Sequence, residues 1–232
     1  MKIKNFKFLE GAAKAEGLTV IIDVFRAYTT AAYLFANQAE KIFIVSKVET
    51  ARKLKKELNN PVLIGERKGI KIEDFDFNNS PYFISQHNFM GKEIILSTSA
   101  GTKGIIAAEN AAEVITGSFV NIAAAAEYIK SKNPETVSLV AMGNNGVTDA
   151  DEDNLYADQL ANLLKGKKTL AQAEIKARLR SPAGDRFFAD ETQSEMPKQD
   201  FEYCLKLNKF NFVIRAEQID SDIYQLIRKE VD

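Results

Sequence analysis

Residues able to do chemistry follow the apolar runs of this sequence. Asp23 lies near the end of the run 18–24, Arg26 follows three residues later, and Thr29 begins the next segment. A carboxylate in this position can hold a divalent cation or attack a phosphoryl group, and a guanidinium clamps anions through its planar fork. The structural alternative is that Thr29 caps a helix and Asp23 pairs with Arg26. Both interpretations stay open on these residues alone.

A second polar stretch, 64–81, combines a carboxylate, several cations and turn-forming residues. It contains Glu66, Arg67, Lys71, Asn79 and Ser80. Cations grouped in this way suit the recognition of a small anion. A charged surface loop closed by an ordinary turn explains the same residues, and by itself that is the stronger interpretation.

Hydroxyl groups and a glycine follow the next apolar run. They are Thr98, Ser99, Gly101 and Thr102. Free backbone N–H groups at the start of a helix, with hydroxyls beside them, form a cradle for an anion. We expect anion binding here, and the alternative is a plain helix N-cap by Ser99 or Thr102.

Further polar groups follow the last two apolar runs of this series. Ser118 and Asn121 come after the first of them, where Ser118 also suits a helix cap. Glu152 and Asp153 belong to a cluster of carboxylates after the second. Such a cluster can hold Mg²⁺. It is equally typical of the first turn of a helix, where the macrodipole favours negative charge, and alone this is the safer interpretation.

The composition excludes several classes of site. The chain has 232 residues, with 31 Lys and Arg against 32 Asp and Glu, so bulk charge gives no support to nucleic-acid binding. The single cysteine, Cys204, excludes a disulfide framework and a zinc site of several thiolates, and the single histidine excludes two-histidine metal motifs. No P-loop or G-x-G-x-x-G motif occurs. Without an apolar N-terminal signal region or a run of about 20 apolar residues, we expect a cytoplasmic protein with no membrane contact.

The elements that position these residues alternate between strands and helices. Strands are expected over 18–24, 41–46, 61–65, 93–98, 113–117 and 136–142. Alternation with helical segments predicts a three-layer α/β/α fold with a mostly parallel, mixed sheet, in which ligands gather at the carboxyl ends of the strands. We expect one domain over 1–232, with 149–232 as its more helical portion. In that portion the sequence predicts helices at 149–164, 170–180 and 201–207, a loop or boundary at 189–199 and a strand at 210–215.

At these same residues the chain resembles the 2-phosphosulfolactate phosphatase family of coenzyme M biosynthesis. The resemblance extends over about residues 20 to 160, with the matching segments in the family's order. These segments are Asp23-Val24-Phe25-Arg26-Ala27 with Thr29-Thr30, Gly65-Glu66-Arg67 with Gly69, Lys71, Phe75-Asp76 and Asn79-Ser80-Pro81, Thr98 with Gly101-Thr102, Gly117-Ser118-Phe119 with Asn121, and Glu152-Asp153 with Ala157. The segment 201–205 is also similar to the family's C-terminal part.

The resemblance implies Mg²⁺-dependent hydrolysis of (2R)-phospho-3-sulfolactate to 3-sulfolactate and phosphate. This small substrate carries a phosphate, a carboxylate and a sulfonate, so its site needs concentrated positive charge. We expect Asp23 to hold Mg²⁺ with Glu152 or Asp153, and Arg26 to hold the transferring phosphate. The attacking group is a water molecule or Asp23 itself. The substrate-binding residues are expected to be Glu66, Arg67, Lys71, Asn79, Ser80, Thr98, Ser99, Gly101, Thr102, Ser118 and Asn121.

The chain departs from the family pattern at several positions. They are Tyr28, Asp74, Asn78, Tyr156 and Asp158. Asp74 adds negative charge beside a loop expected to meet an anion, which leaves the exact substrate open. The alternative functions are a phosphatase for another small phosphorylated hydroxy acid, and a protein on the same scaffold that binds an anionic metabolite without turnover. Homo-oligomers are common among such enzymes, and the sequence leaves the oligomeric state open.

Overall fold

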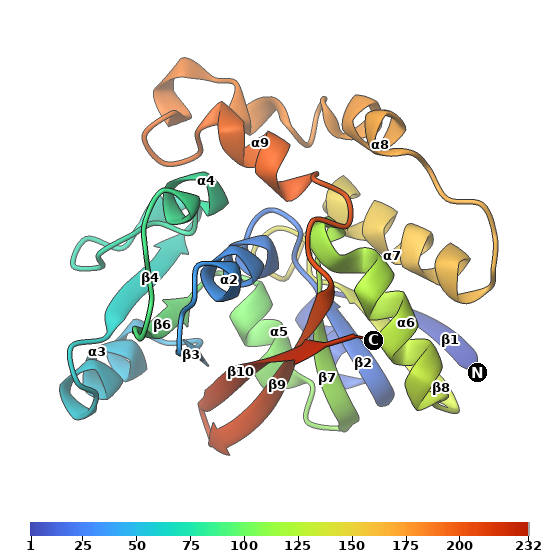
Figure 1. Ribbon diagram of the computed structural model, residues 1–232, viewed down its shortest axis with the longest axis horizontal. Coiled ribbons are helices and arrows are strands. Elements are labelled where there is room, and N and C mark those ends of the chain that lie inside the picture. Colours follow the sequence, from blue (N-terminus) through green and yellow to red (C-terminus); the bar gives the residue numbers. More distant parts are fainter. Residues whose placement is uncertain (232) are drawn as a thin grey trace.

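A single mixed sheet forms the centre of the computed structural model, which describes residues 1–231 (Figure 1). Its ten strands lie in the order β1-β8-β2-β7-β9-β10-β3-β6-β4-β5. The strands are β1 (Lys2–Lys7), β2 (Gly17–Ile22), β3 (Lys41–Val45), β4 (Val62–Arg67), β5 (Ile70–Lys71), β6 (Glu93–Ser97), β7 (Ala111–Gly117), β8 (Thr136–Ala141), β9 (Phe212–Asp220) and β10 (Ile223–Glu230).

Two parallel groups of strands make up most of the sheet, and an antiparallel hairpin joins them. In one group β1, β8, β2 and β7 are parallel neighbours, and in the other β3, β6 and β4 are. The hairpin β9–β10 lies between them and pairs antiparallel with β7 on one side and β3 on the other. The expectation of a mostly parallel, mixed sheet is therefore confirmed.

Helices cover both faces of the sheet, as the three-layer prediction requires. They are α1 (Phe8–Ala13), α2 (Ala27–Ala36), α3 (Val48–Glu57), α4 (Pro81–Ser85), α5 (Gly101–Ala107), α6 (Ile122–Lys132), α7 (Asp151–Leu164), α8 (Gln172–Leu179) and α9 (Lys198–Cys204). Alternate residues of β2 enter different cores: Ile21 packs with residues of α2 and α5, whereas Val20 and Ile22 pack with α6 and α7. This is the two-residue period of a strand buried on both faces.

The sequence pattern does not predict β1 or β10, and it predicts only approximate bounds for the C-terminal elements. In β1 the alternation is masked by lysines, and the apolar positions of β10 are separated by polar ones. The predicted strand at 210–215 extends to Asp220, and the helix predicted at 201–207 begins at Lys198 instead. The segment 189–199, expected as a loop or boundary, contains a short 3₁₀ turn at Asp190–Thr192.

The segment that carries α8 and α9 runs along one side of the molecule, at the top of Figure 1. Its buried residues Ile175, Leu179 and Phe201 belong to the same core as α6 and α7. Among the helices of residues 1–231, none combines the length and the apolar character that crossing a membrane requires.

Candidate active site

A cavity of about 260 Å³ lies where several parallel strands end. Asp23 follows β2, Glu66 belongs to the last part of β4, Ser99 follows β6, and Gly143 follows β8. The cavity therefore draws on both parallel groups of the sheet, at the edge where α/β sheets bind ligands. The predicted site residues that line it are Asp23, Arg26, Glu66, Asn79, Ser99, Glu152 and Asp153.

Asp23 is held by backbone N–H groups from two elements. Its Oδ1 accepts the N–H of Ala27 at 3.1 Å, and its Oδ2 accepts the N–H of Gly101 at 2.9 Å. Only 7 % of Asp23 is exposed. The pKa of this carboxyl is raised to about 6, chiefly by burial and also by the charges of Glu66 and Glu152, while the two N–H donors oppose the shift.

Asp153 fastens the first turn of α7 to the ends of β2 and β8. Its Oδ1 accepts the N–H of Val24 at 2.9 Å, and its Oδ2 accepts the N–H of Gly143 at 2.8 Å. Burial raises the pKa of Asp153 well above its ordinary value, and the charges of Glu152 and Asp23 add to the shift. Asp153 and Asp23 thus repel each other electrostatically across a buried site.

Glu152 pairs with Arg186, which is not among the predicted site residues. Its Oε1 accepts a hydrogen bond from Arg186 at 2.6 Å. Burial nevertheless raises the pKa of Glu152, although the arginine opposes the shift. The same guanidinium donates to Asn144 Oδ1 at 3.0 Å, so Arg186 links the start of α7 to the loop after β8.

These carboxylates suit a divalent cation that completes its shell with substrate and water oxygens. Asp23, Glu152 and Asp153 all have raised pKa values, which means that their negative charges are poorly compensated by the protein. Within residues 1–231, no group of three or more His, Cys, Asp or Glu side chains is arranged as a metal cage. Mg²⁺ is typically held by one or two carboxylates together with substrate phosphates, so the residues present fit that ion.

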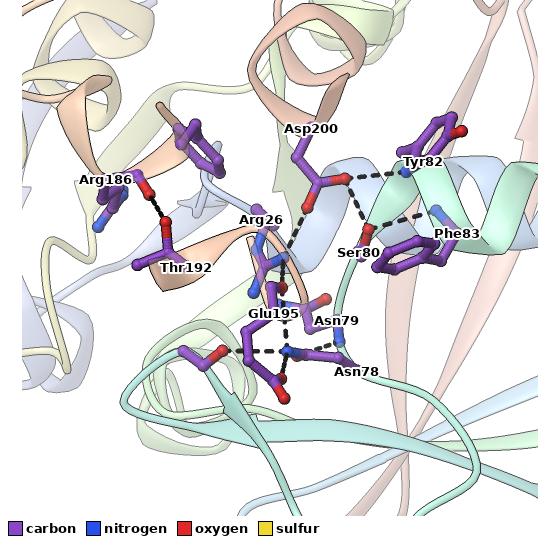
Figure 2. A network of polar contacts seen from close by, with 12 residues as sticks. Arg26, Asn78, Asn79, Ser80, Tyr82, Phe83, Arg186, Thr192, Glu195 and Asp200 are labelled. Atoms are coloured by element: carbon purple, nitrogen blue, oxygen red, sulfur yellow. Dashed lines mark hydrogen bonds and ion pairs between the residues drawn. The ribbon is translucent and has the colours of Figure 1, made fainter. Parts of the chain in front are cut away.

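Arg26 enters the cavity from the loop after β2, with 4 % of its surface exposed. The structural alternative for these residues predicts an ion pair between Arg26 and Asp23, and the structure does not contain that pair within residues 1–231. One terminal nitrogen donates to Asp200 Oδ2 at 2.6 Å and to the carbonyl of Glu195 at 2.7 Å (Figure 2). Thr29 does not cap α2 either, because its hydroxyl donates to the carbonyl of Val24 at 3.0 Å.

Glu66 organises two loops of the cavity instead of offering charge to an anion. Its Oε1 accepts the N–H of Ser99 at 2.6 Å. Its Oε2 accepts the N–H of Gly69 at 2.7 Å and the hydroxyl of Ser99 at 3.0 Å. A carboxylate does not attract an anionic substrate, so its role is to fix the backbone on both sides of the cavity.

Two predicted substrate-binding cations, Arg67 and Lys71, lie outside the lining of the cavity. The guanidinium of Arg67 donates to the carbonyl of Ser46 at 2.9 Å, to the hydroxyl of Ser97 at 2.9 Å and to the carbonyl of Glu66. The ammonium of Lys71 donates to the carbonyl of Phe75 at 2.6 Å. Both cations satisfy carbonyls of strand ends and turns.

In the hydroxyl-rich loop, groups that the sequence predicts to be free for an anion already have hydrogen-bond partners in the protein. The hydroxyl of Thr102 donates to the carbonyl of Thr98 at 3.0 Å, and both residues are buried away from the cavity. The N–H of Gly101, expected to be free for an anion, donates to Asp23. Of this loop, Ser99 and Ala100 line the cavity.

Three other predicted binding residues have structural partners elsewhere. Ser80 caps α4 by accepting the N–H of Phe83 at 3.2 Å. Ser118 donates to Asn121 Oδ1 at 3.3 Å, and the amide of Asn121 donates to the carbonyl of Phe212 at 2.9 Å. These last two residues connect the end of β7 to β9, and neither lines the cavity.

Lys68 and Arg186 are the cavity cations that the site prediction missed. No strand period marks Lys68, because it follows the last residue of β4 in a turn and has a φ of +56°. Nothing local marks Arg186, which reaches the cavity from the C-terminal segment. Two buried atoms of the lining, Asn79 Oδ1 and Arg186 Nε, have no hydrogen-bond partner within residues 1–231, so a bound ligand is their expected partner.

Two departures from the family pattern have structural explanations. Asp74 forms a two-pronged pair with Arg52, at 2.9 Å for each bond, and lies outside the cavity lining. Its charge is therefore not directed at a ligand. The amide of Asn78 donates to the carbonyl of Gly69 at 3.0 Å and to that of Glu195 at 3.1 Å, which ties the loop after β4 to the C-terminal segment.

Comparison with known proteins gives a consistent result. Residues 7–218 match the family described as 2-phosphosulpholactate phosphatase. The chain is 35 % identical over 223 residues to a probable 2-phosphosulfolactate phosphatase of Carboxydothermus hydrogenoformans, a match that covers 92 % of each chain. It is 30 % identical over 203 residues to the probable 2-phosphosulfolactate phosphatase of Bacillus subtilis, covering 87 % of each. The chain belongs to the 2-phosphosulfolactate phosphatase family.

Proposed function

We propose that this protein is a phosphoric monoester hydrolase that converts 2-phospho-3-sulfolactate and water to 3-sulfolactate and inorganic phosphate, with Mg²⁺ as its cofactor. The observation that carries the proposal is the composition of one cavity. Buried carboxylates with raised pKa values face Arg26, Lys68 and Arg186 there. The names of the relatives support the same reaction. The family resemblance extends the proposal to a cytoplasmic step of coenzyme M biosynthesis.

The charges of the substrate match those of the cavity. Its phosphate carries roughly −1.5 to −2 near neutral pH, and the carboxylate and sulfonate add one negative charge each. Arg26, Lys68 and Arg186 offer cations to these groups. Asp23 and Asp153 are the carboxylates that would hold Mg²⁺, which would neutralise charge on the phosphoryl oxygens when bound.

Positioning and charge neutralisation are the main requirements of phosphoryl transfer, and the chain supplies both. Asp23 and Asp153 are fixed by four backbone N–H groups, so they change position little as the reaction proceeds. Two guanidinium nitrogens of Arg26 have no acceptor within residues 1–231 and would donate to the phosphoryl oxygens. The amide oxygen of Asn79 is buried and has no partner among residues 1–231, so it would accept a hydrogen bond from a hydroxyl group or water in the cavity.

The decisive experiment measures release of inorganic phosphate from racemic 2-phospho-3-sulfolactate, first with Mg²⁺ and then with excess chelator. Phosphoglycolate and phospholactate are assayed in parallel as substrates without a sulfonate. Metal-dependent release that favours the sulfonated substrate is the expected result. Release from the other two compounds alone would assign a different hydroxy-acid phosphatase.

A binding assay separates the remaining alternative. A protein that only binds an anionic metabolite shows a ligand-dependent rise in melting temperature with no phosphate released. That outcome, with Mg²⁺ present and the protein folded, would overturn the proposed activity.

A further inference from the structure

Asp200, on α9, is enclosed by the groups that it contacts. None of its surface is exposed. Its Oδ2 accepts the hydrogen bond from Arg26 at 2.6 Å, while its Oδ1 accepts the hydroxyl of Ser80 at 2.7 Å and the N–H of Tyr82 at 3.0 Å. Figure 2 shows this carboxylate between Arg26 and the start of α4. Asp200 itself does not line the cavity.

The C-terminal segment contacts Arg26 through one terminal guanidinium nitrogen. The same terminal nitrogen that donates to Asp200 also donates to the carbonyl of Glu195. The other two guanidinium nitrogens of Arg26 have no acceptor within residues 1–231, although the side chain is almost fully buried. Because Arg26 lines the cavity, these free N–H groups are the ones available to an anion.

Contacts other than the one with Arg26 also fix the position of the Asp200 carboxylate. Its second oxygen is held by two donors from the α4 region, so the carboxylate has little freedom to turn. The planar guanidinium therefore has one orientation that satisfies both acceptors of the C-terminal segment. A buried pair of this kind adds little net stability compared with an apolar pair, which makes a role in orientation the better explanation for it.

We infer that Asp200 is the positioning residue that orients Arg26 toward the phosphoryl group, and that Asp200 touches no substrate itself. The inference rests on the proposed function, since it assigns the geometry of the phosphate-binding arginine. The competing explanation is that Asp200 only braces α9 against α4 through Ser80 and Tyr82.

The test is a double-mutant cycle of Asp200→Asn and Arg26→Gln. Asparagine keeps an oxygen for Ser80 and Tyr82 but removes the charged acceptor of Arg26. We expect Asp200→Asn to raise KM for 2-phospho-3-sulfolactate and Kd for inorganic phosphate, measured by calorimetry, by about tenfold or more. Both losses are expected to vanish when Asp200→Asn is added to Arg26→Gln, because the effect passes through Arg26.

Two further variants keep the result interpretable. Glu202→Gln is the matched control, because Glu202 lies on the same helix, is exposed and pairs with Lys176; its KM and phosphate Kd stay at wild-type values. If Asp200→Asn does not fold, Asp200→Glu retains the charge while displacing the carboxylate by one methylene, and we expect it to weaken phosphate binding severalfold in a folded protein.

Several results would overturn the inference. One is an Asp200→Asn variant that is less stable but binds phosphate with the same Kd as the wild type, because Asp200 would then only brace α9 against α4. Another is an Asp200→Asn substitution that weakens phosphate binding equally in the wild-type and Arg26→Gln backgrounds. If the wild type releases phosphate from none of the substrates, the proposed function fails, and the calorimetric cycle still decides the role of Asp200. Absence of phosphate binding by the wild type itself would overturn the inference as well.

Discussion

The N–H of Gly101, the first residue of α5, donates to Oδ2 of Asp23 at 2.9 Å. Asp23 follows β2 and Gly101 follows β6, and these strands belong to the two different parallel groups of the sheet. A backbone N–H from one half of the cavity therefore holds a buried carboxylate of the other half, whose pKa is raised. A Cβ atom on residue 101 would lie 2.9 Å from that oxygen and 3.1 Å from Tyr28 Cζ, so glycine permits the contact.

Gly101→Ala is expected to lower kcat about tenfold or more, because the new methyl group displaces the Asp23 carboxylate from its position. We expect stability to fall by about 1 to 3 kcal/mol from overpacking, measured by urea unfolding. Gly166→Ala is the control. A Cβ atom at this position would meet open space, but the φ of +66° strains alanine, so we expect the substitution to lower stability by about 1 kcal/mol without changing kcat. Equal kcat values for the two variants would contradict the assigned importance of this contact.

Asp23→Asn is expected to lower kcat by about 100-fold or more in a folded protein. The substitution removes the charge and leaves one backbone N–H facing the side-chain amide nitrogen, which cannot accept a hydrogen bond. The measurement is phosphate release, with circular dichroism to verify folding. Asp74→Asn is the matched control, since Asp74 is an exposed carboxylate paired with Arg52, and its loss should leave turnover unchanged. Near-normal turnover of Asp23→Asn would remove Asp23 from the site.

The raised pKa of Asp23 predicts how stability and Mg²⁺ binding depend on pH. Its pKa is about 6 in the folded protein against about 3.8 for the ordinary carboxyl, so the folded state binds this proton more tightly. Stability of the metal-free protein from this group is therefore greatest below about pH 4 and is lost as pH rises through 6. Burial raises the pKa values of Glu152 and Asp153 as well, which acts in the same direction.

Mg²⁺ competes with these protons, so its stabilising effect should grow with pH. We expect a larger rise in melting temperature on adding Mg²⁺ at pH 7.5 than at pH 5, with NaCl of equal ionic strength as the control. In Asp23→Asn the difference between the two pH values should shrink. The same rise at both pH values would argue that the cation binds elsewhere.

Substitutions of the adjacent cations Arg67, in β4, and Lys68, in the turn after it, should have different effects on KM and stability. Lys68→Ala is expected to raise KM about tenfold with little change in stability, because Lys68 lines the cavity. Arg67→Met is expected to lower stability by about 2 kcal/mol and to change KM less, because its guanidinium satisfies acceptors at the ends of neighbouring strands. Steady-state kinetics and urea unfolding of both variants test this division, and a reversed pattern would return Arg67 to the substrate site.

Local pattern was enough to predict the fold class and much of the catalytic end of the sheet. The runs that became β2, β3, β6 and β8 were located to within a few residues, because fully buried parallel strands are almost continuously apolar. The carboxyl-end rule then selected Asp23, Glu66, Ser99 and Asp153 from the polar residues that follow such runs. The strands β1 and β10 could not be predicted from the pattern because lysines and other polar residues interrupt their apolar positions.

Only the tertiary structure decided which charged groups meet in the cavity. Arg67 and Lys68 are adjacent in sequence, yet the backbone at the end of β4 directs one toward strand carbonyls and the other to the cavity. Arg186 and Asp200 come from a segment more than a hundred residues away from Asp23 and Arg26, and no local periodicity marks them. The physical reason is that hydrophobic burial fixes local elements through short-range pattern, whereas buried charges are compensated by partners that chain folding brings together.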